Sequence, residues 1–383
     1  MAARRTHLTT MVLGLLGLAA FISTANAVFC CPFCDEKGPT LVGDFGMAAL
    51  VLFGHVENNR LDSNGDFTTD FIIEKVIKSH DAVKDKTLLK LRRNIPPTKS
   101  KFLIFCDVLK GGVIDDYRGV EVAAGSDMVK YLQGAISIKE KTPGERLRYS
   151  FDFLNDTEFE VAIDAYREFA KADYKDYQTM AKNLPPDVIA KWLSDPKTPV
   201  FRYGLYGSLL GHCGTPEHAK LLRSMVEDAV KRKTSTIDGL LAGYLMLQPK
   251  EAWPFLTNIL GDPKIDFGAR YACLRTVSFL WEQRPDLVDK KDLTAGLLLI
   301  LDQPEMADFG VDYLRKYKCW ETTGQVLDLF GKQGYQIPII KRTILRFALR
   351  SPEARAVAFV EQQRKRDPEW VKDIDELLKQ ERQ

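Results

Sequence analysis

Three cysteines stand within five positions near the start of the chain, in the stretch VFCCPFCDE: Cys30, Cys31 and Cys34. Cys31 and Cys34 have the spacing of a C-x-x-C dithiol motif. Thiolates at this spacing can exchange disulfides or bind zinc, and in an oxidising compartment such cysteines can form structural disulfides instead. The stretch therefore has three chemical interpretations: thiol redox catalysis, zinc binding and a structural disulfide. The sequence around it indicates which of them is favoured.

The sequence context weakens the first two interpretations. In thioredoxin-like folds the dithiol follows a strand and begins a helix, but only Val28 and Phe29 of the expected mature chain precede these cysteines. A structural zinc site needs four ligands, and the three cysteines would need Cys106 or His55 to complete them. A thiol-redox or zinc-binding protein that uses Cys30, Cys31 and Cys34 remains an alternative, and we expect no cofactor.

A structural disulfide is the interpretation that we favour. The chain has seven cysteines, so at least one has no partner within the chain. Cys106 lies in an expected strand and shares its face with hydrophobic residues, which makes it a candidate partner for the N-terminal segment. The disulfide candidates are thus Cys30, Cys31, Cys34 and Cys106, with the connectivity left open. The other cysteines lie in helical segments, where we expect small buried side chains: Cys213, Cys273 and Cys319.

The first 27 residues have the pattern of a signal peptide. A basic segment, MAARRTHLTT, precedes the apolar run MVLGLLGLAAFIS, and ANA at 25–27 supplies the small residues of a cleavage site. We therefore expect export to the periplasm, the cell envelope or the exterior, with no membrane span after cleavage. The net charge of +2 gives no sign of a nucleic-acid partner, so the expected partner is an unidentified protein of the periplasm or envelope.

After a cysteine-rich segment at 28–46, hydrophobic residues alternate with polar ones over 47–140. In FTTDFIIEKVIK, one face has Phe67, Thr69, Phe71 and Ile73, and the polar face has Thr68, Asp70 and Glu74. We expect strands at 48–57, 67–78, 86–93 and 100–109, with shorter ones near 117–123 and 134–138, and a hairpin turn at Asn64-Gly65. Short antiparallel strands at this spacing predict a small barrel or sandwich.

From 141 to 383 the period becomes helical. Segments at 144–156, 156–172 and 185–195 are amphipathic and are separated by caps or prolines. Asp-Pro or Gly breaks followed by apolar helices then recur at an irregular spacing near about 35 residues, close to the range of helical-pair repeats. Such repeats predict an α-solenoid.

Two family resemblances follow from these patterns. ALVLFGHVENN, FTTDFIIEKVIK and SKFLIFCDV resemble the OB barrels of the netrin-like and metalloprotease-inhibitor group, and residues 145–375 resemble HEAT repeats. The whole arrangement is similar to uncharacterised exported bacterial proteins. The resemblance implies an α+β multidomain chain, with an OB/netrin-like antiparallel β barrel and a HEAT-like α-solenoid. It also implies a third hypothesis, a protease inhibitor acting through the N-terminal cysteine segment, although Val28-Phe29 precede Cys30 and C-C-x-x-C replaces the inhibitors' C-x-C.

The chain contains no G-x-S-x-G, Walker, G-x-G-x-x-G or H-E-x-x-H motif. We therefore expect a non-enzymatic interaction or scaffold protein. Because helical repeats present extended faces and aromatic residues anchor interfaces, the candidate surface residues are aromatic: Tyr203, Tyr206, Tyr271, Trp281 and Trp320.

Overall fold

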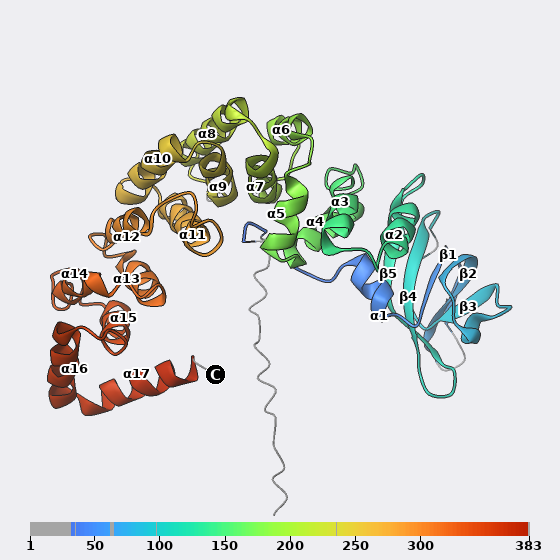
Figure 1. The fold of residues 1–383 in the computed structure, drawn as a ribbon. Helices are drawn as coiled ribbons and strands as arrows, with labels where there is room; N and C mark the ends of the chain where they lie inside the picture. Colours follow the sequence, from blue (N-terminus) through green and yellow to red (C-terminus); the bar gives the residue numbers. More distant parts are fainter. Residues whose placement is uncertain (1–31, 35, 62–64, 97, 235, 382–383) are drawn as a thin grey trace, which may run out of the picture.

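The computed structural model describes residues 32–34, 36–61, 65–96, 98–234 and 236–381, and shows an antiparallel sheet followed by a long series of helices (Figure 1). The strands are β1 (Leu50–Leu61), β2 (Phe67–Lys78), β3 (Leu88–Leu91), β4 (Lys101–Val108) and β5 (Ile114–Val122). The α-helices are α1 (Leu41–Met47), α2 (Met128–Ser137), α3 (Pro143–Phe151), α4 (Phe159–Lys171), α5 (Tyr174–Ala181), α6 (Pro186–Ser194), α7 (Tyr203–Cys213), α8 (Pro216–Lys231), α9 (Asp238–Leu247), α10 (Pro249–Gly261), α11 (Phe267–Gln283), α12 (Lys290–Leu298), α13 (Ala307–Lys316), α14 (Thr323–Asp328), α15 (Pro338–Ala348), α16 (Ala354–Arg366) and α17 (Pro368–Gln380). Short 3-10 helices lie at Asp81–Val83, Val200–Arg202 and η3 (Trp320–Thr322).

The five strands form an open sheet in the order β3-β2-β1-β4-β5, and every neighbouring pair is antiparallel. Within the described residues β3 and β5 each pair with one neighbour only, so the expected closed barrel is not shown. Successive side chains point to opposite faces of a strand, which separates the sheet into two apolar faces. Val51, Leu103 and Phe105 pack with the helices, whereas Ile104 and Cys106 belong to a second cluster.

The sequence prediction of a strand at 134–138 is wrong, because these residues fall at the end of α2 or just after it. The buried residues of α2 are Met128, Tyr131, Leu132 and Ala135, which have helical spacing and lie on one face. A short apolar run such as GAISI has no period of its own, so only the longer pattern that begins at Met128 identifies the helix.

The expected alternation along β2 also fails at two positions. Asp70, predicted on the polar face, is buried, and it accepts hydrogen bonds from both terminal nitrogens of Arg60 at 2.8 and 2.9 Å. Phe67, predicted on the apolar face, is 44 % exposed. An ion pair with two parallel hydrogen bonds offsets the cost of burying the carboxylate, so a charged residue can occupy an interior position of the strand.

One buried carboxylate connects the sheet region to the helices. Asp164 of α4 accepts a hydrogen bond from the backbone N–H of Leu41 at the start of α1, and another from the hydroxyl of Tyr131 in α2 at 2.9 Å. Burial raises the pKa of Asp164 to about 6. Nearby, Arg118 of β5 forms an ion pair with Asp44 of α1. We call the contacts of Asp164 with Leu41 and Tyr131 the sheet joint.

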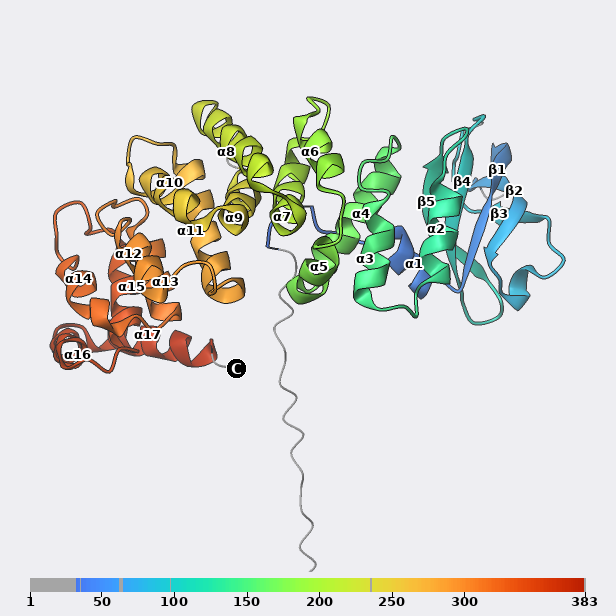
Figure 2. The ribbon, with the colours of Figure 1, turned by 45° about the horizontal axis from the view of Figure 1, so that its top comes forward.

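The helices from α3 onward follow one another in an arc, with the sheet at one end and α17 at the other (Figures 1 and 2). The predicted helices at 144–156, 156–172 and 185–195 are confirmed as α3, α4 and α6, with slightly different ends. Figure 1 shows α5, α7, α9 and α11 along the inner side of the arc and α6, α8 and α10 along the outer side. No helix within the described ranges combines the length and the apolar character that crossing a bilayer requires.

Helices α7 and α9 are in backbone contact near the middle of the arc. A Cβ atom at Gly211 would lie 2.5 Å from the Cα of Gly243, and one at Gly207 would lie 2.8 Å from the Cα of Leu240. Both distances are too short for any side chain, so glycine is required where the two backbones meet.

Candidate functional site

Residues 32–34, here called the Phe33 turn, lie on the inner side of the arc (Figure 1). Phe33 is 2 % exposed, and its ring meets that of Phe279 of α11 edge-on with the centroids 4.8 Å apart. The Phe33 carbonyl oxygen lies 2.6 Å from the place that a Cβ at Gly204 of α7 would occupy. Cys34 is also buried. One part of the cysteine stretch is therefore packed against the helices.

A buried polar group lies beneath the Phe33 turn. The ring of Tyr174 packs on Phe279, and its hydroxyl lies 3.1 Å from Nε2 of His212 in α7. Burial lowers the pKa of His212 to about 3, and the positive charges of Arg284 and Lys182 lower it further. His212 is therefore neutral at physiological pH, and its contacts are those of a packing residue.

Cys106 lies in a different part of the molecule from Cys34. It is fully buried in the second sheet cluster, with Ile104 beside it and Phe102 and Val108 against it, which confirms the strand face expected from the sequence. Cys106 forms no disulfide with another described cysteine. Cys30 and Cys31 lie outside the described residues, so a disulfide from either of them to Cys106 or Cys34 stays a prediction.

The environment of the thiols bears on redox chemistry. Burial raises the pKa of Cys106 to about 12 and that of Cys213 to about 11, and it raises the pKa of Cys273 and Cys319 as well. Because the thiolate is the nucleophile, these four thiols are held in their unreactive form. No three His, Cys, Asp or Glu residues in the described part of the chain, which does not include Cys30 and Cys31, are placed to hold a metal.

The five aromatic candidates occupy different environments. Tyr206 is fully buried and its hydroxyl donates to the carbonyl of Leu154 at 2.8 Å, which makes it a core residue. Tyr203, Tyr271 and Trp320 are half-buried and pack against the core. Trp281 is also half-buried and lines an open hollow, and Trp320 lines a second hollow beside it.

Trp281 of α11 stacks on Tyr317, which follows α13, with the ring centroids 4.4 Å apart and the planes at 13°. The Tyr317 hydroxyl donates to Oε1 of Glu282 at 2.8 Å and lies 2.7 Å from the hydroxyl of Ser278. The Lys316 ammonium is 5.5 Å from the Tyr317 ring centroid and pairs with Glu282 at 2.6 Å. These contacts fix the aromatic pair in one orientation.

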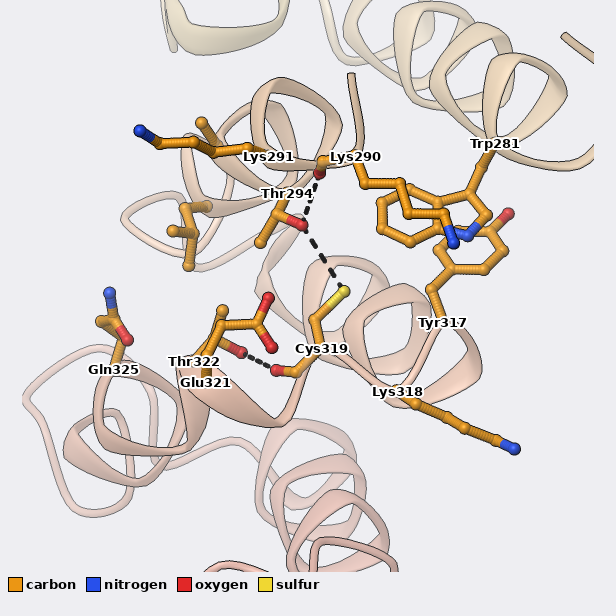
Figure 3. Close-up of a pocket in the computed structure, with 12 residues that line it drawn as sticks. Trp281, Lys290, Lys291, Thr294, Tyr317, Lys318, Cys319, Glu321, Thr322 and Gln325 are labelled. Atoms are coloured by element: carbon orange, nitrogen blue, oxygen red, sulfur yellow. Dashed lines mark hydrogen bonds between the residues drawn. The ribbon is translucent and has the colours of Figure 1, made fainter. Parts of the chain in front are cut away.

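The hollow beside this pair has a volume of about 570 Å³ and is called the Trp281 hollow. Figure 3 shows Thr294 and Cys319 at its centre, where Oγ1 and Sγ lie 3.6 Å apart, and Lys290 extending beside Trp281 and Tyr317. Its lining is polar around an aromatic wall: Trp281, Lys290, Lys291, Thr294, Ala295, Leu298, Tyr317, Lys318, Cys319, Glu321, Thr322 and Gln325. Such a lining can bind a group that is apolar in one part and charged in another.

Of this hollow, sequence reasoning singled out only Trp281 as a surface residue. It missed Tyr317 and three lysines, Lys290, Lys291 and Lys318. Lys290 and Lys291 begin α12, and Tyr317 and Lys318 follow α13, whereas Trp281 belongs to α11, so no local spacing connects them. The one local signal is the run RKYKCW at 315–320, which combines basic and aromatic side chains.

Comparison of the chain with protein-family models, with curated proteins and with solved structures finds no match in any of the three. A functional argument for this chain therefore depends on the chemistry of its own residues.

Proposed function

We propose that this chain is an exported, non-enzymatic scaffold protein that binds a partner protein of the periplasm or cell envelope through its helical arc. In this proposal the sheet region is an OB/netrin-like module and the helices are HEAT-like repeats forming a solenoid. The observation that carries the proposal is the Trp281–Tyr317 stack at the open Trp281 hollow, because fixed, partly exposed aromatic rings are favoured interface anchors.

The N-terminal cysteines have a structural role in the same proposal. Burial of Phe33 and Cys34 holds the Phe33 turn in one place, and a disulfide made by Cys30 or Cys31 would secure that segment further. The raised pKa of the buried thiols favours this role over thiol exchange for Cys106. The zinc and protease-inhibitor hypotheses depend on Cys30 and Cys31, which are outside the described residues.

A photo-crosslinking amino acid tests the interaction. It would be placed at Gln325 on the rim of the hollow and, as a control, at Lys220 on the outer helix α8, and each variant would be expressed in native cells. We expect discrete protein adducts at position 325 and few at 220. Absence of adducts at 325, or equal adducts at both positions, would contradict the proposal.

Thiol counting and zinc measurement on the same exported protein test the role of the cysteines. We expect fewer than seven free thiols and no stoichiometric zinc. One bound zinc per chain would contradict the structural role and support zinc binding. A dithiol at Cys31 and Cys34 that is reduced and reoxidised reversibly at an oxidoreductase potential would instead support thiol redox chemistry.

A further inference from the structure

The Trp281 hollow has an excess of positive charge at its rim. Lys290, Lys291 and Lys318 are exposed, and within the described part of the chain none of their ammonium groups makes an ion pair or a hydrogen bond. Glu321 is the carboxylate among the lining residues. Figure 3 shows the three lysines extending in different directions around the rim, and the flexible lysine stem lets the ammonium groups turn toward a bound anion.

A second hollow next to the first is also lined by basic side chains. It has a volume of about 750 Å³ and adjoins the first at Lys318, which lines both. Its lining residues are Arg315, Lys316, Lys318, Trp320, Arg350, Pro352 and Glu381. Together the two hollows have six basic and two acidic side chains, although the whole chain has a net charge of only +2. Arg315 pairs with Asp312 and Glu381, and Lys316 pairs with Glu282. Among the described residues, the basic side chains of this surface that have no ion-pair partner are therefore Lys290, Lys291, Lys318 and Arg350.

From these observations we propose that the two hollows bind an extended acidic peptide segment of the partner, with an aromatic or aliphatic side chain between its carboxylates. The lysines would pair with the carboxylates, and the Trp281–Tyr317 wall would contact the apolar side chain. Glu321 and Glu381 within the hollows oppose a chain of evenly spaced phosphates, whereas a peptide can place a neutral residue beside each of them. This inference rests on the proposed function and names the chemistry of its partner.

A labelled synthetic peptide, EDEWEDLE, serves as the probe, and its neutral counterpart QNQWQNLQ serves as the charge control. Binding to the mature full-length chain would be followed by fluorescence anisotropy at low and high salt. We expect the triple variant K290E/K291E/K318E to weaken binding of EDEWEDLE by about tenfold or more, and added salt to weaken binding to the unaltered chain. The variant E321K should tighten binding, because it removes a carboxylate from the hollow.

The matched control is K220E/K250E/K264E, which makes the same charge change at three exposed lysines outside the two hollows. It should leave the affinity within about twofold. Equal weakening by both triple variants, or equal binding of QNQWQNLQ, would overturn the inference. Tighter binding of a labelled thymidine dodecanucleotide, lost in K290E/K291E/K318E, would overturn it in favour of a general polyanion site.

Crosslinking at Gln325 separates this inference from the proposed function. If K290E/K291E/K318E keeps its circular dichroism spectrum and its protein adducts at 325, the proposed function stands and the acidic partner is wrong. If EDEWEDLE binds as expected but no protein adduct forms at 325 in the unaltered chain, the proposed function fails while the hollow remains a peptide-binding surface.

Discussion

The sheet joint contains a buried acid, Asp164, and the inner side of the arc contains a buried base, His212; burial shifts the pKa values of the two in opposite directions. Asp164 at the sheet joint has its pKa raised to about 6, whereas His212 beneath the Phe33 turn has its pKa lowered to about 3. The physical cause is the same, because a low dielectric disfavours the charged form of either group. Lowering the pH therefore stabilises the contacts of the sheet joint and destabilises those on the inner side of the arc.

The direction of each effect follows from which state binds more protons. Between about pH 4 and 6 the folded chain binds more protons at Asp164 than the unfolded chain does, so the contribution of this residue to stability falls as the pH rises. Between about pH 3 and 6.5 the unfolded chain binds more protons at His212, so its contribution falls as the pH falls. In the unaltered protein the two contributions oppose each other over their shared range.

Replacing the histidine should give the largest change. His212→Gln keeps a hydrogen-bonding group near Tyr174 but cannot be protonated, so the variant should lose up to about 5 kcal/mol of acid-induced destabilisation between pH 6.5 and 3. Guanidinium unfolding as a function of pH measures this. His80→Gln, at an exposed histidine, should retain the pH dependence of the unaltered chain. An unchanged acid slope in His212→Gln would show that the histidine is not buried neutral.

Removing the Phe33 ring should destabilise the inner side of the arc and leave the sheet joint unchanged. Phe33→Ala should lower the free energy of unfolding by about 4 kcal/mol, because it leaves a cavity against Phe279. Phe33→Leu should cost about 1 kcal/mol, since most of the apolar volume remains. Hydrogen exchange should speed up in α7 and α11 and stay unchanged in α1 and α2. Equal loss of protection in all four helices would contradict the separation of the two regions.

Replacing the buried acid should remove the opposite pH dependence. Asp164→Asn cannot ionise, so the decrease of about 3 kcal/mol in stability between pH 4 and 6 should disappear. The contribution of His212 is then unopposed, so the net loss of stability on acidification should become steeper. The same unfolding titration detects this. Asp289→Asn, at an exposed aspartate, should leave the profile unchanged. A flatter profile in Asp164→Asn would have the wrong sign and would refute the assignment.

The smallest expected effect concerns the approach of the Phe33 turn to α7. Gly204→Ala places a Cβ 2.6 Å from the Phe33 carbonyl oxygen, so the turn must shift, at about 2 kcal/mol. Gly46→Ala, where a Cβ meets no atom within 4 Å, should leave stability unchanged or slightly higher. Thermal unfolding of the two variants measures the difference. Similar melting temperatures would show that the turn does not press on α7.

Local pattern predicted those parts of the fold that depend on neighbouring residues. The strand expected at 67–78 is β2 with the same ends, and Cys106 lies on the strand face that its alternation indicated. Closure of the sheet depends on whether the edge strands β3 and β5 pair, and alternation shows which face a residue occupies but not which strands pair, so it could not distinguish an open sheet from a barrel.

The candidate site was harder to predict because its contacts are long-range. The contact of Phe33 with Phe279 joins the start of the described chain to α11, and the Trp281–Tyr317 stack joins α11 to the end of α13. Residue type alone favoured both Tyr206 and Trp281 as surface anchors. Only the packing shows that the first is enclosed and the second lines a hollow.

The backbone contact between α7 and α9 has a mechanical consequence. Helices usually slide past one another by repacking the side chains between them, and at Gly207, Gly211 and Gly243 there is no such layer. We therefore expect α7 and α9 to move as one rigid pair. Changes in the curvature of the arc must then occur at the helix contacts on either side of this pair. Strain produced by a peptide bound beside α11 would accordingly be taken up at the helix contacts on either side of the α7–α9 pair and not within it.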